Sequence, residues 1–269
     1  MSKNLYYSDV KILKKPLKQR IKTCLNFLLI LIVGVGCFLS ASYLSSALTV
    51  GNLGAFIVYG DTKVKFKETS LYAVVLGEYS SKTEAEKVAI TSAIQGASGY
   101  IWEDTSYWVV GNIYNTIEDA NKVIDNLKES NYKAVVKQIV FPSVVIDFDM
   151  YESSDMGVIN KSFSIFDELR QLLYDYSIKF DKGEINHLAI SSYLSSSRGE
   201  VKSIIIDVQN LINKAKSELN SVQEYLVKTD ELLDELIIKT IDNSATGYSL
   251  KYAIASIARF KYELFVELS

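Results

Sequence analysis

The chain has 269 residues, of which 48% are hydrophobic and 23% are charged. This composition excludes an intrinsically disordered protein and leaves room for a membrane anchor and two modest domains. The net charge of −3 is unevenly distributed: residues 1–60 hold seven Lys and Arg against one acid, whereas the remaining residues hold 22 bases and 31 acids. An acidic body argues against nucleic-acid binding, which needs clustered Lys and Arg, so no nucleic-acid partner is expected.

Cysteine and histidine are scarce. Cys24 and Cys37 both fall in the apolar N-terminal segment, and His187 is the single histidine, for which we expect a structural or surface role. A disulfide within the body, a Cys- or His-rich metal site and most His-paired nucleophiles are therefore excluded. Gly-x-Ser-x-Gly and P-loop motifs are also missing. The sequence predicts a protein that is not an enzyme, with no catalytic residues, no metal and no cofactor.

A long uncharged segment near the N-terminus follows a basic one. Residues 23–60 carry no charge, and about 20 apolar helical residues cross a bilayer. The bases that lie closest before this segment are Lys11, Lys14, Lys15, Lys18, Arg20 and Lys22. We therefore expect a basic cytoplasmic tail over residues 1–23, one transmembrane helix over 24–48 and a linker over 49–70, with the C-terminal body outside the cytoplasm. The alternative is a cleaved signal peptide whose apolar core is residues 25–39.

The sequence contains an internal repeat. Residues 72–88, YAVVLGEYSSKTEAEKV, align without a gap with residues 107–123, YWVVGNIYNTIEDANKV. A repeat at one fixed offset is a stronger signal than any single residue in it. Because two copies are too few for a solenoid, the repeat predicts one compact domain built from two similar halves.

Strand and helix patterns alternate through this region. The expected strands cover residues 71–76, 98–103, 107–111 and 132–140, and the expected helices cover residues 80–97 and 116–130. The resulting order, β-α-β-β-α-β, is the split βαβ arrangement of ferredoxin-like folds. We therefore predict an α+β fold in which residues 71–142 form one four-stranded sheet. Two helices cover one face of this sheet, and the other face is open.

The repeated motif resembles that of a known family. Each copy reads Tyr-x-Val, an aromatic residue five positions later, then Ser or Thr, then Glu or Asp followed by Ala. Over residues 71–140 this pattern resembles the SPOR domain, a bacterial module that binds peptidoglycan glycan strands stripped of stem peptides. A basic tail, one span, such a domain and a helical C-terminus also resemble the layout of sporulation proteins from endospore-forming bacteria. The resemblance implies a bacterial cell membrane protein with a cell-wall ligand.

The open sheet face is the predicted glycan site. Strand alternation places Ala73, Val75, Ser106, Trp108 and Val110 on this face, away from the helices. In the family, the position of Val75 is often a Gln that contacts glycan, and the position of Ser106 is often aromatic. Trp108 is the expected replacement for that aromatic platform. Trp102 and Tyr100 on the neighbouring strand are further candidates, since aromatic rings stack on sugars, although such residues are also common in packing.

Helical periodicity dominates the rest of the chain. After Pro142 we expect a linker over residues 143–158 that begins with a short strand and continues as an acidic segment. A bundle of about four antiparallel helices is expected over residues 159–269. The apolar stripes of these helices are interpreted as the bundle core. The sequence does not identify a protein partner for the bundle, but one is possible.

Two functions agree with these patterns. The first is a membrane-anchored protein that binds glycan strands at a division or sporulation septum. The alternative is an anchored scaffold whose SPOR-like fold no longer binds glycan and whose bundle recruits a protein partner.

Overall fold

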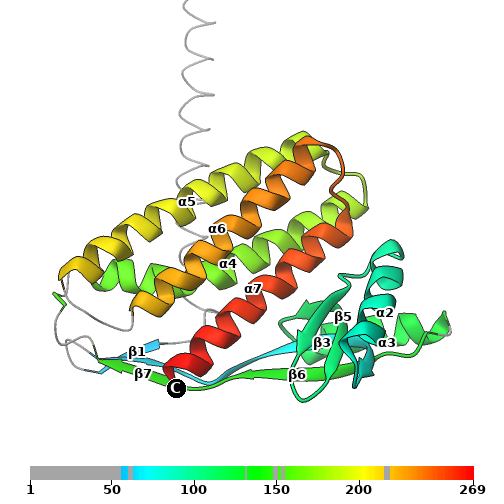
Figure 1. The fold of residues 1–269 in the computed structure, drawn as a ribbon, viewed down its shortest axis with the longest axis horizontal. Coiled ribbons are helices and arrows are strands. Elements are labelled where there is room, and N and C mark those ends of the chain that lie inside the picture. Colours follow the sequence, from blue (N-terminus) through cyan, green and yellow to red (C-terminus); the bar gives the residue numbers. More distant parts are fainter. Residues whose placement is uncertain (1–55, 60–62, 131, 148–150, 153–154, 215–218) are drawn as a thin grey trace, which may run out of the picture. The chain divides into compact units, whose positions relative to one another are not determined.

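Two antiparallel sheets and six helices make up the part of the chain that the computed structural model describes (Figure 1). The described residues are 56–269 apart from 60–62, 131, 148–150, 153–154 and 215–218. Residues Leu53–Ser269 form one compact unit. The predicted cytoplasmic tail, residues 1–23, and the predicted transmembrane helix, residues 24–48, lie outside the described residues. None of the helices in the described ranges combines the length and hydropathy needed to cross a bilayer.

The larger sheet contains the sequence repeat. Its strands are ordered β4-β5-β3-β6, and every neighbouring pair is antiparallel. The elements are β3 (Thr69–Tyr79), α2 (Lys82–Ile94), β4 (Tyr100–Glu103), β5 (Tyr107–Tyr114), α3 (Ile117–Glu129) and β6 (Val135–Phe141). Thr116 caps α3, because its Oγ1 accepts a hydrogen bond from the backbone N–H of Asp119 at 3.2 Å.

The turn between α2 and β4 requires glycine. Gly99 has φ +60°, and a Cβ at this position would lie 2.6 Å from the backbone oxygen of Ala89. An L-residue is strained in this left-handed conformation, and the backbone oxygen cannot move aside cheaply. Gly99 therefore lets the chain turn back close beneath α2 and enter β4.

The two faces of the larger sheet carry the residues that strand alternation predicted. Tyr72 and Val74 pack beneath α3, in one cluster with Ala120 and Ile124 of that helix. Ala73, Val75 and Val110 point to the opposite face and are almost fully buried there. The β3–β5 register shifts on either side of Val75, which is a β-bulge that bends the strand. The predicted assignment of these residues to faces is confirmed.

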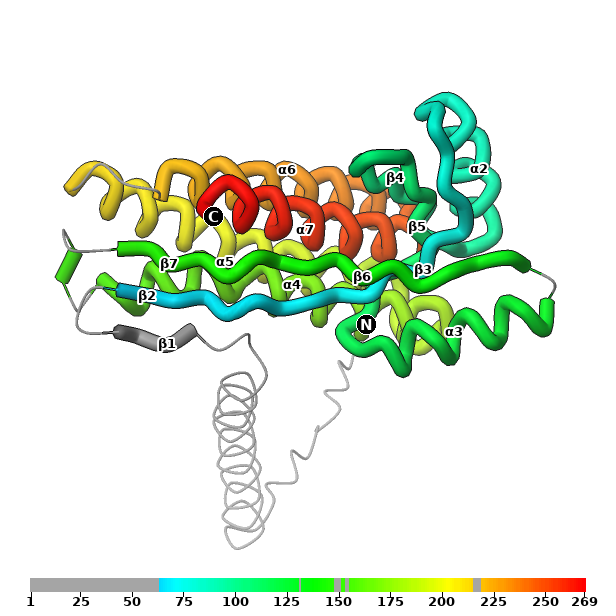
Figure 2. The backbone as a smooth tube through the Cα atoms, turned by 90° about the horizontal axis from the view of Figure 1, so that it is seen from below, coloured from blue at the N-terminus to red at the C-terminus, as the bar shows by residue number. Residues whose placement is uncertain are grey.

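A second sheet lies where the sequence predicted linkers. Its order is β1-β2-β7, with β1 (Phe56–Tyr59), β2 (Lys63–Phe66) and β7 (Val144–Asp147) paired antiparallel. β2 leads directly into β3 and β7 follows β6, so the two pairs form one long ribbon along the molecule (Figure 2). In β2 the lysines alternate with buried Val64 and Phe66, the pattern of a strand with one core face.

Four long helices form the C-terminal part: α4 (Met156–Asp181), α5 (His187–Lys214), α6 (Leu219–Ile241) and α7 (Gly247–Leu268). The most extensively buried is α7, whose buried side chains include Leu250, Ile254, Ile257 and Leu264. A narrow stripe cannot account for this, because the residues between these positions, Ala253, Ala255 and Ala258, are buried as well. α7 is therefore enclosed on more than one side.

One continuous core explains the burial of α7. It joins Val75, Trp102 and Val110 of the larger sheet and Phe66 of β2 to apolar residues of all four helices. Phe265 of α7 meets the rings of Phe66, Phe141 and Phe163, with centroid distances of 5.6, 6.2 and 6.2 Å. Both views show α7 running next to the sheets, with its C-terminal end beside β7 (Figures 1 and 2).

The predicted fold class needs correction. We expected one ferredoxin-like sheet with an open face, a membrane helix before it and a separate helical bundle after it. The described structure is α+β with six helices and two small sheets, none of those helices suits a bilayer, and α7 covers the face that was expected to be open. The physical reason is that Ala73, Val75 and Val110 give this face an apolar surface, which is stable when another element removes it from water.

Buried charges also hold α7 to α4. The Nζ of Lys261 lies 2.6 Å from Asp167, and Arg170 lies 3.6 Å from the same carboxylate. Asp167, Arg170 and Lys261 are all largely shielded from water. Two cations therefore share one carboxylate within the α4–α7 contact, so loss of this carboxylate would leave both cations shielded and without an anion.

Candidate functional site

Val75 is buried in the core that the sheet shares with the four long helices, and Trp102 is buried beneath α7. Their exposed fractions are 1% and 2%, so no sugar can reach either side chain in this structure. The Trp102 ring packs edge to face against Tyr262 of α7, with 5.5 Å between ring centroids. The guanidinium of Arg259, also on α7, lies 5.0 Å from the Trp102 ring centroid. Trp102 therefore binds a helix of its own chain in the way an aromatic platform would bind a ligand.

Polar contacts fix α7 along the same face. Arg259 Nη1 donates a hydrogen bond to the backbone oxygen of Glu103 at 2.7 Å, at the end of β4. One turn from the start of α7, Lys251 Nζ donates to the backbone oxygen of Gly96 at 2.8 Å. The same ammonium pairs with Asp181 of α4 at 2.7 Å. The sheet, α4 and α7 are thus joined by directional bonds as well as by the apolar core.

Tyr100 lies at the margin of this contact. Its ring meets Tyr252 of α7 edge to face, with 5.2 Å between centroids. Burial raises the pKa of the Tyr100 phenol, and the neighbouring Tyr252 raises this pKa further. Tyr100 is therefore a neutral packing residue at physiological pH.

Trp108 and Ser106 lie in a polar group at the edge of the covered face. Trp108 is half-buried, and its Nε1 donates a hydrogen bond to Ser106 Oγ at 2.9 Å. Ser106 Oγ in turn donates to Glu78, and Lys137 Nζ lies 2.7 Å from the same carboxylate. We name Glu78, Ser106, Trp108 and Lys137 the rim cluster.

The rim cluster is internally satisfied. Lys137 lies 4.1 Å from the centroid of the Trp108 ring, in the geometry of a cation–π contact. Hydrogen bonds from Lys137 and Ser106 hold the pKa of Glu78 below its usual value. A ligand that stacks on this side of Trp108 must first displace the Lys137 ammonium. Whether the cluster binds glycan stays a prediction.

The structure thus divides the five predicted site residues into two groups. Trp108 and Ser106 are bonded to each other at the rim, whereas Val75, Trp102 and Tyr100 contact the core or α7. Sequence reasoning missed Glu78 and Lys137, which are separated from each other by most of the domain. Strand alternation places Lys137 on the same face as its partner Ala73, but its reach to Trp108 depends on the bulge and twist of β3.

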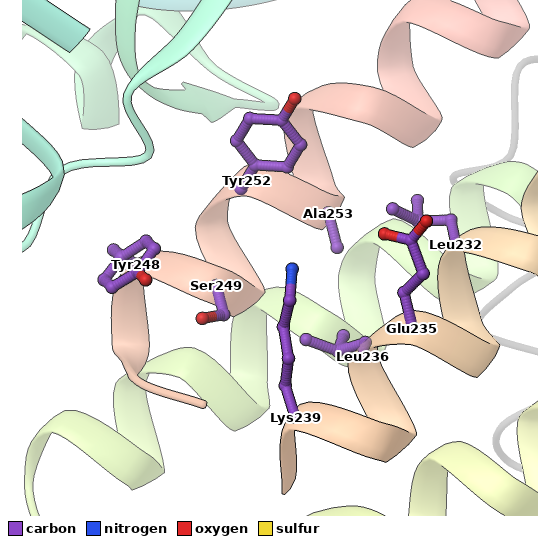
Figure 3. A pocket seen from close by; sticks show the side chains of 8 residues that line it. All are labelled: Leu232, Glu235, Leu236, Lys239, Tyr248, Ser249, Tyr252 and Ala253. Atoms are coloured by element: carbon purple, nitrogen blue, oxygen red, sulfur yellow. The ribbon is translucent and has the colours of Figure 1, made fainter. Parts of the chain in front are cut away.

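A hollow opens between α6 and α7, and Tyr252, which packs against Tyr100, is one of the residues that line it (Figure 3). Its volume is about 180 Å³, and its lining residues are Leu232, Glu235, Leu236, Lys239, Tyr248, Ser249, Tyr252 and Ala253. The side chains of Glu235 and Lys239 extend from α6 toward α7, and Tyr248 and Tyr252 stand on the α7 side. The hollow therefore has an apolar floor, a phenolic wall and a rim that carries both charges.

The described part of the chain contains no group of three His, Cys, Asp or Glu side chains suited to hold a metal ion. His187, the single histidine, is a structural contact between α5 and the loop before α7, with Nε2 2.8 Å from the backbone oxygen of Ala245. No protein-family model, curated protein or solved structure matches the chain. Function must therefore be argued from the geometry alone.

Proposed function

We propose that the protein is a non-enzymatic, membrane-anchored scaffold whose sheet and helices act as one body and recruit a protein partner at a bacterial septum. One observation carries this proposal: α7 seals the sheet face on which the SPOR-like resemblance predicts glycan binding. The anchor in the proposal rests on the uncharged residues 23–60 and the bases before them.

The energetics of the sealed face support this choice over glycan binding by the same face. Exposing that face would return Val75, Val110 and Trp102 to water, together with the apolar side chains of α7 that cover them. Each fully buried large apolar side chain contributes about 1.5–3 kcal/mol. Weak binding of a neutral sugar cannot offset the loss of several such contacts, so the closed arrangement is the working form.

A sedimentation assay tests the proposal. The full chain in neutral detergent is mixed with purified peptidoglycan sacculi, with and without amidase treatment that removes the stem peptides. We expect the protein to stay in the supernatant in both cases. Saturable sedimentation with amidase-treated sacculi would show that the fold still binds glycan and would overturn the scaffold proposal.

Glycan binding through the rim cluster is a second candidate, because Trp108 is only partly buried at the edge of the covered face. In this case the change Trp108→Ala would abolish sedimentation with treated sacculi while the thermal unfolding of the protein changed little. Ile90→Ser on α2, whose side chain is 64% exposed and not part of the rim cluster, is the control and should leave sedimentation unchanged.

The proposed topology has its own test. A reporter that is active only in the cytoplasm, fused after Ser269, should be silent if the body lies outside the membrane. Strong reporter activity would reverse the orientation. Recovery of a soluble mature chain that begins near Thr49 would instead favour the cleaved signal peptide.

A further inference from the structure

The geometry points to the α6–α7 hollow and the outward stripe of α6 as the docking surface for a basic amphipathic helix of a protein partner. This inference rests on the proposed scaffold function and names the site and the chemistry of the partner. Three features of the surface carry it: the size of the hollow, exposed apolar side chains on α6 and α7, and carboxylates of α6 that form no ion pair with a described residue.

The hollow has the size of one large side chain. Its volume of about 180 Å³ is similar to the roughly 150 Å³ cavity that holds a benzene molecule in another protein. Leu232, Leu236 and Ala253 supply apolar walls, and the Tyr248 and Tyr252 rings flank the opening (Figure 3). An aromatic or branched aliphatic side chain of a partner would fill this space and exclude water from it.

Exposed apolar side chains extend the surface beyond the hollow. Tyr248 and Tyr252 are 37% and 44% exposed on α7, and Ile238 on α6 is 53% exposed. Ile94, at 81%, ends α2, two residues before the Gly96 carbonyl that binds Lys251 of α7. Single exposed apolar residues are ordinary, but Tyr248 and Tyr252 line the hollow itself, and Ile238 lies on the same helix as its lining residues Glu235 and Lys239. Exposed apolar residues next to a hollow indicate an interaction surface.

The outward stripe of α6 is acidic and unpaired. Glu231, Glu235, Ile238 and Asp242 follow at spacings of four, three and four residues, which places them on one side of the helix and its end. Among the described residues, no Lys, Arg or His lies within 4.0 Å of these three carboxylates. By contrast, Arg198 pairs with two other acids of this region, Asp230 and Asp234.

The charge of the stripe selects the partner. A helix that lies along the groove between α6 and α7 would place apolar side chains over the hollow and Ile238, and Lys or Arg over the carboxylates. Lys239 is the one cation among the described residues that line the hollow, so the three carboxylates of the stripe leave this surface acidic on balance. An acidic helix would face like charge there, and a neutral helix would leave the carboxylates without cations. The partner that fits is therefore helical, basic on one face and apolar on the other.

A peptide-binding experiment tests the inference with the full chain in neutral detergent. The probe is a fluorescent amphipathic peptide of leucine and lysine, about five helical turns long, and its binding is measured by fluorescence anisotropy. A peptide in which every lysine is replaced by glutamate, and protein-free micelles, are the controls. We expect saturable binding of the lysine peptide only, weakened by added salt because the attraction is partly ionic.

Two paired substitutions locate the site. The pair Ile238→Ser and Tyr248→Ser removes apolar contacts, and the pair Glu231→Gln and Glu235→Gln removes negative charge. Each pair should weaken peptide binding, raising the dissociation constant by about tenfold. All four side chains lie on the surface, so the thermal melting of each variant should match that of the parent and show that the fold is intact.

The control variants carry equivalent changes elsewhere on the surface. Ile206→Ser on α5 with Ile90→Ser on α2 matches the apolar pair, since these side chains are 62% and 64% exposed. Glu118→Gln with Glu129→Gln on α3 matches the charge pair. Both controls should bind the peptide as the parent does.

The inference is overturned if the lysine peptide does not bind, or if the site variants and the control variants weaken binding equally. Either result leaves the scaffold proposal to be judged by sedimentation with sacculi. Conversely, glycan binding in that assay would refute the scaffold proposal without changing the outcome of the peptide titration.

Discussion

Replacing Trp102 tests whether α7 covers the sheet in solution. The side chain is 2% exposed, and it contacts Tyr262 and Arg259 of α7. A buried Trp or Phe changed to Ala costs about 3–5 kcal/mol, part of it from the cavity that remains. A domain of this size has a total stability of about 5–15 kcal/mol, so Trp102→Ala should lower its melting temperature by roughly 6–20 °C.

The assay is urea unfolding of the full chain in neutral detergent, followed by circular dichroism. A double-mutant cycle with Tyr262→Ala separates the α7 contact from other effects of the substitution. Because the rings touch, the cycle should give a coupling free energy of about 0.5–3 kcal/mol. Trp108→Ala is the matched control, since the loss of this partly buried ring should cost less free energy than the loss of Trp102 and should show little coupling to Tyr262.

A specific result would refute the reasoning. If α7 did not pack on the sheet, Trp102 would lie on an open surface, where substitutions usually change stability by less than about 0.5 kcal/mol. A small cost for Trp102→Ala, combined with no coupling to Tyr262, would mean that the face is open. The predicted glycan site on that face would then regain its support.

Three further predictions follow from buried charge, backbone strain and a buried phenol. Asp167→Asn should destabilise the protein by about 3–5 kcal/mol, and by more than Lys261→Met, because it leaves two shielded cations without an anion. The free energy of unfolding of both variants is measured by chemical denaturation, and equal losses would argue against the shared carboxylate. Gly99→Ala should cost at least about 1–2 kcal/mol from its positive φ alone, and an unchanged melting temperature would contradict the strained turn. Burial raises the pKa of Tyr100, so the folded state holds the phenol proton more tightly than the unfolded chain does. The stability that this provides is fully present below about pH 10, the ordinary tyrosine value, and is lost as pH rises above it; Tyr100→Phe should reduce that alkaline loss when unfolding is measured across the range.

Local periodicity was enough to identify most elements of the described chain. Alternation with period two placed Tyr72 and Val74 on one face of β3 and Ala73 and Val75 on the other, because successive side chains of a strand point to opposite sides. The repeat marked two similar β-α-β halves, and apolar spacing of three and four marked the long helices of the C-terminal part. The smaller sheet was missed because its central strand, β2, pairs with β7, and the larger sheet's strands lie between them in the sequence. Pairing between strands so far apart leaves no periodic signal.

The sequence also selected candidate site residues whose side-chain chemistry suits sugars, but it could not say which of them water reaches. An apolar face indicates that something must cover it, and an amphipathic helix indicates that one side must be buried. Neither pattern names the partner, since the free energy of apolar burial is non-directional and depends on area rather than identity. Here the partner of the sheet is α7, more than 100 residues further along the chain. Only the tertiary structure decided that Trp102 packs against Tyr262 and Arg259 and that Lys137 lies over Trp108. It also decided that Glu235 of α6 faces Tyr248 and Tyr252 of α7 across a hollow. Each of these contacts joins residues of different elements, whose separation in sequence carries no periodic trace.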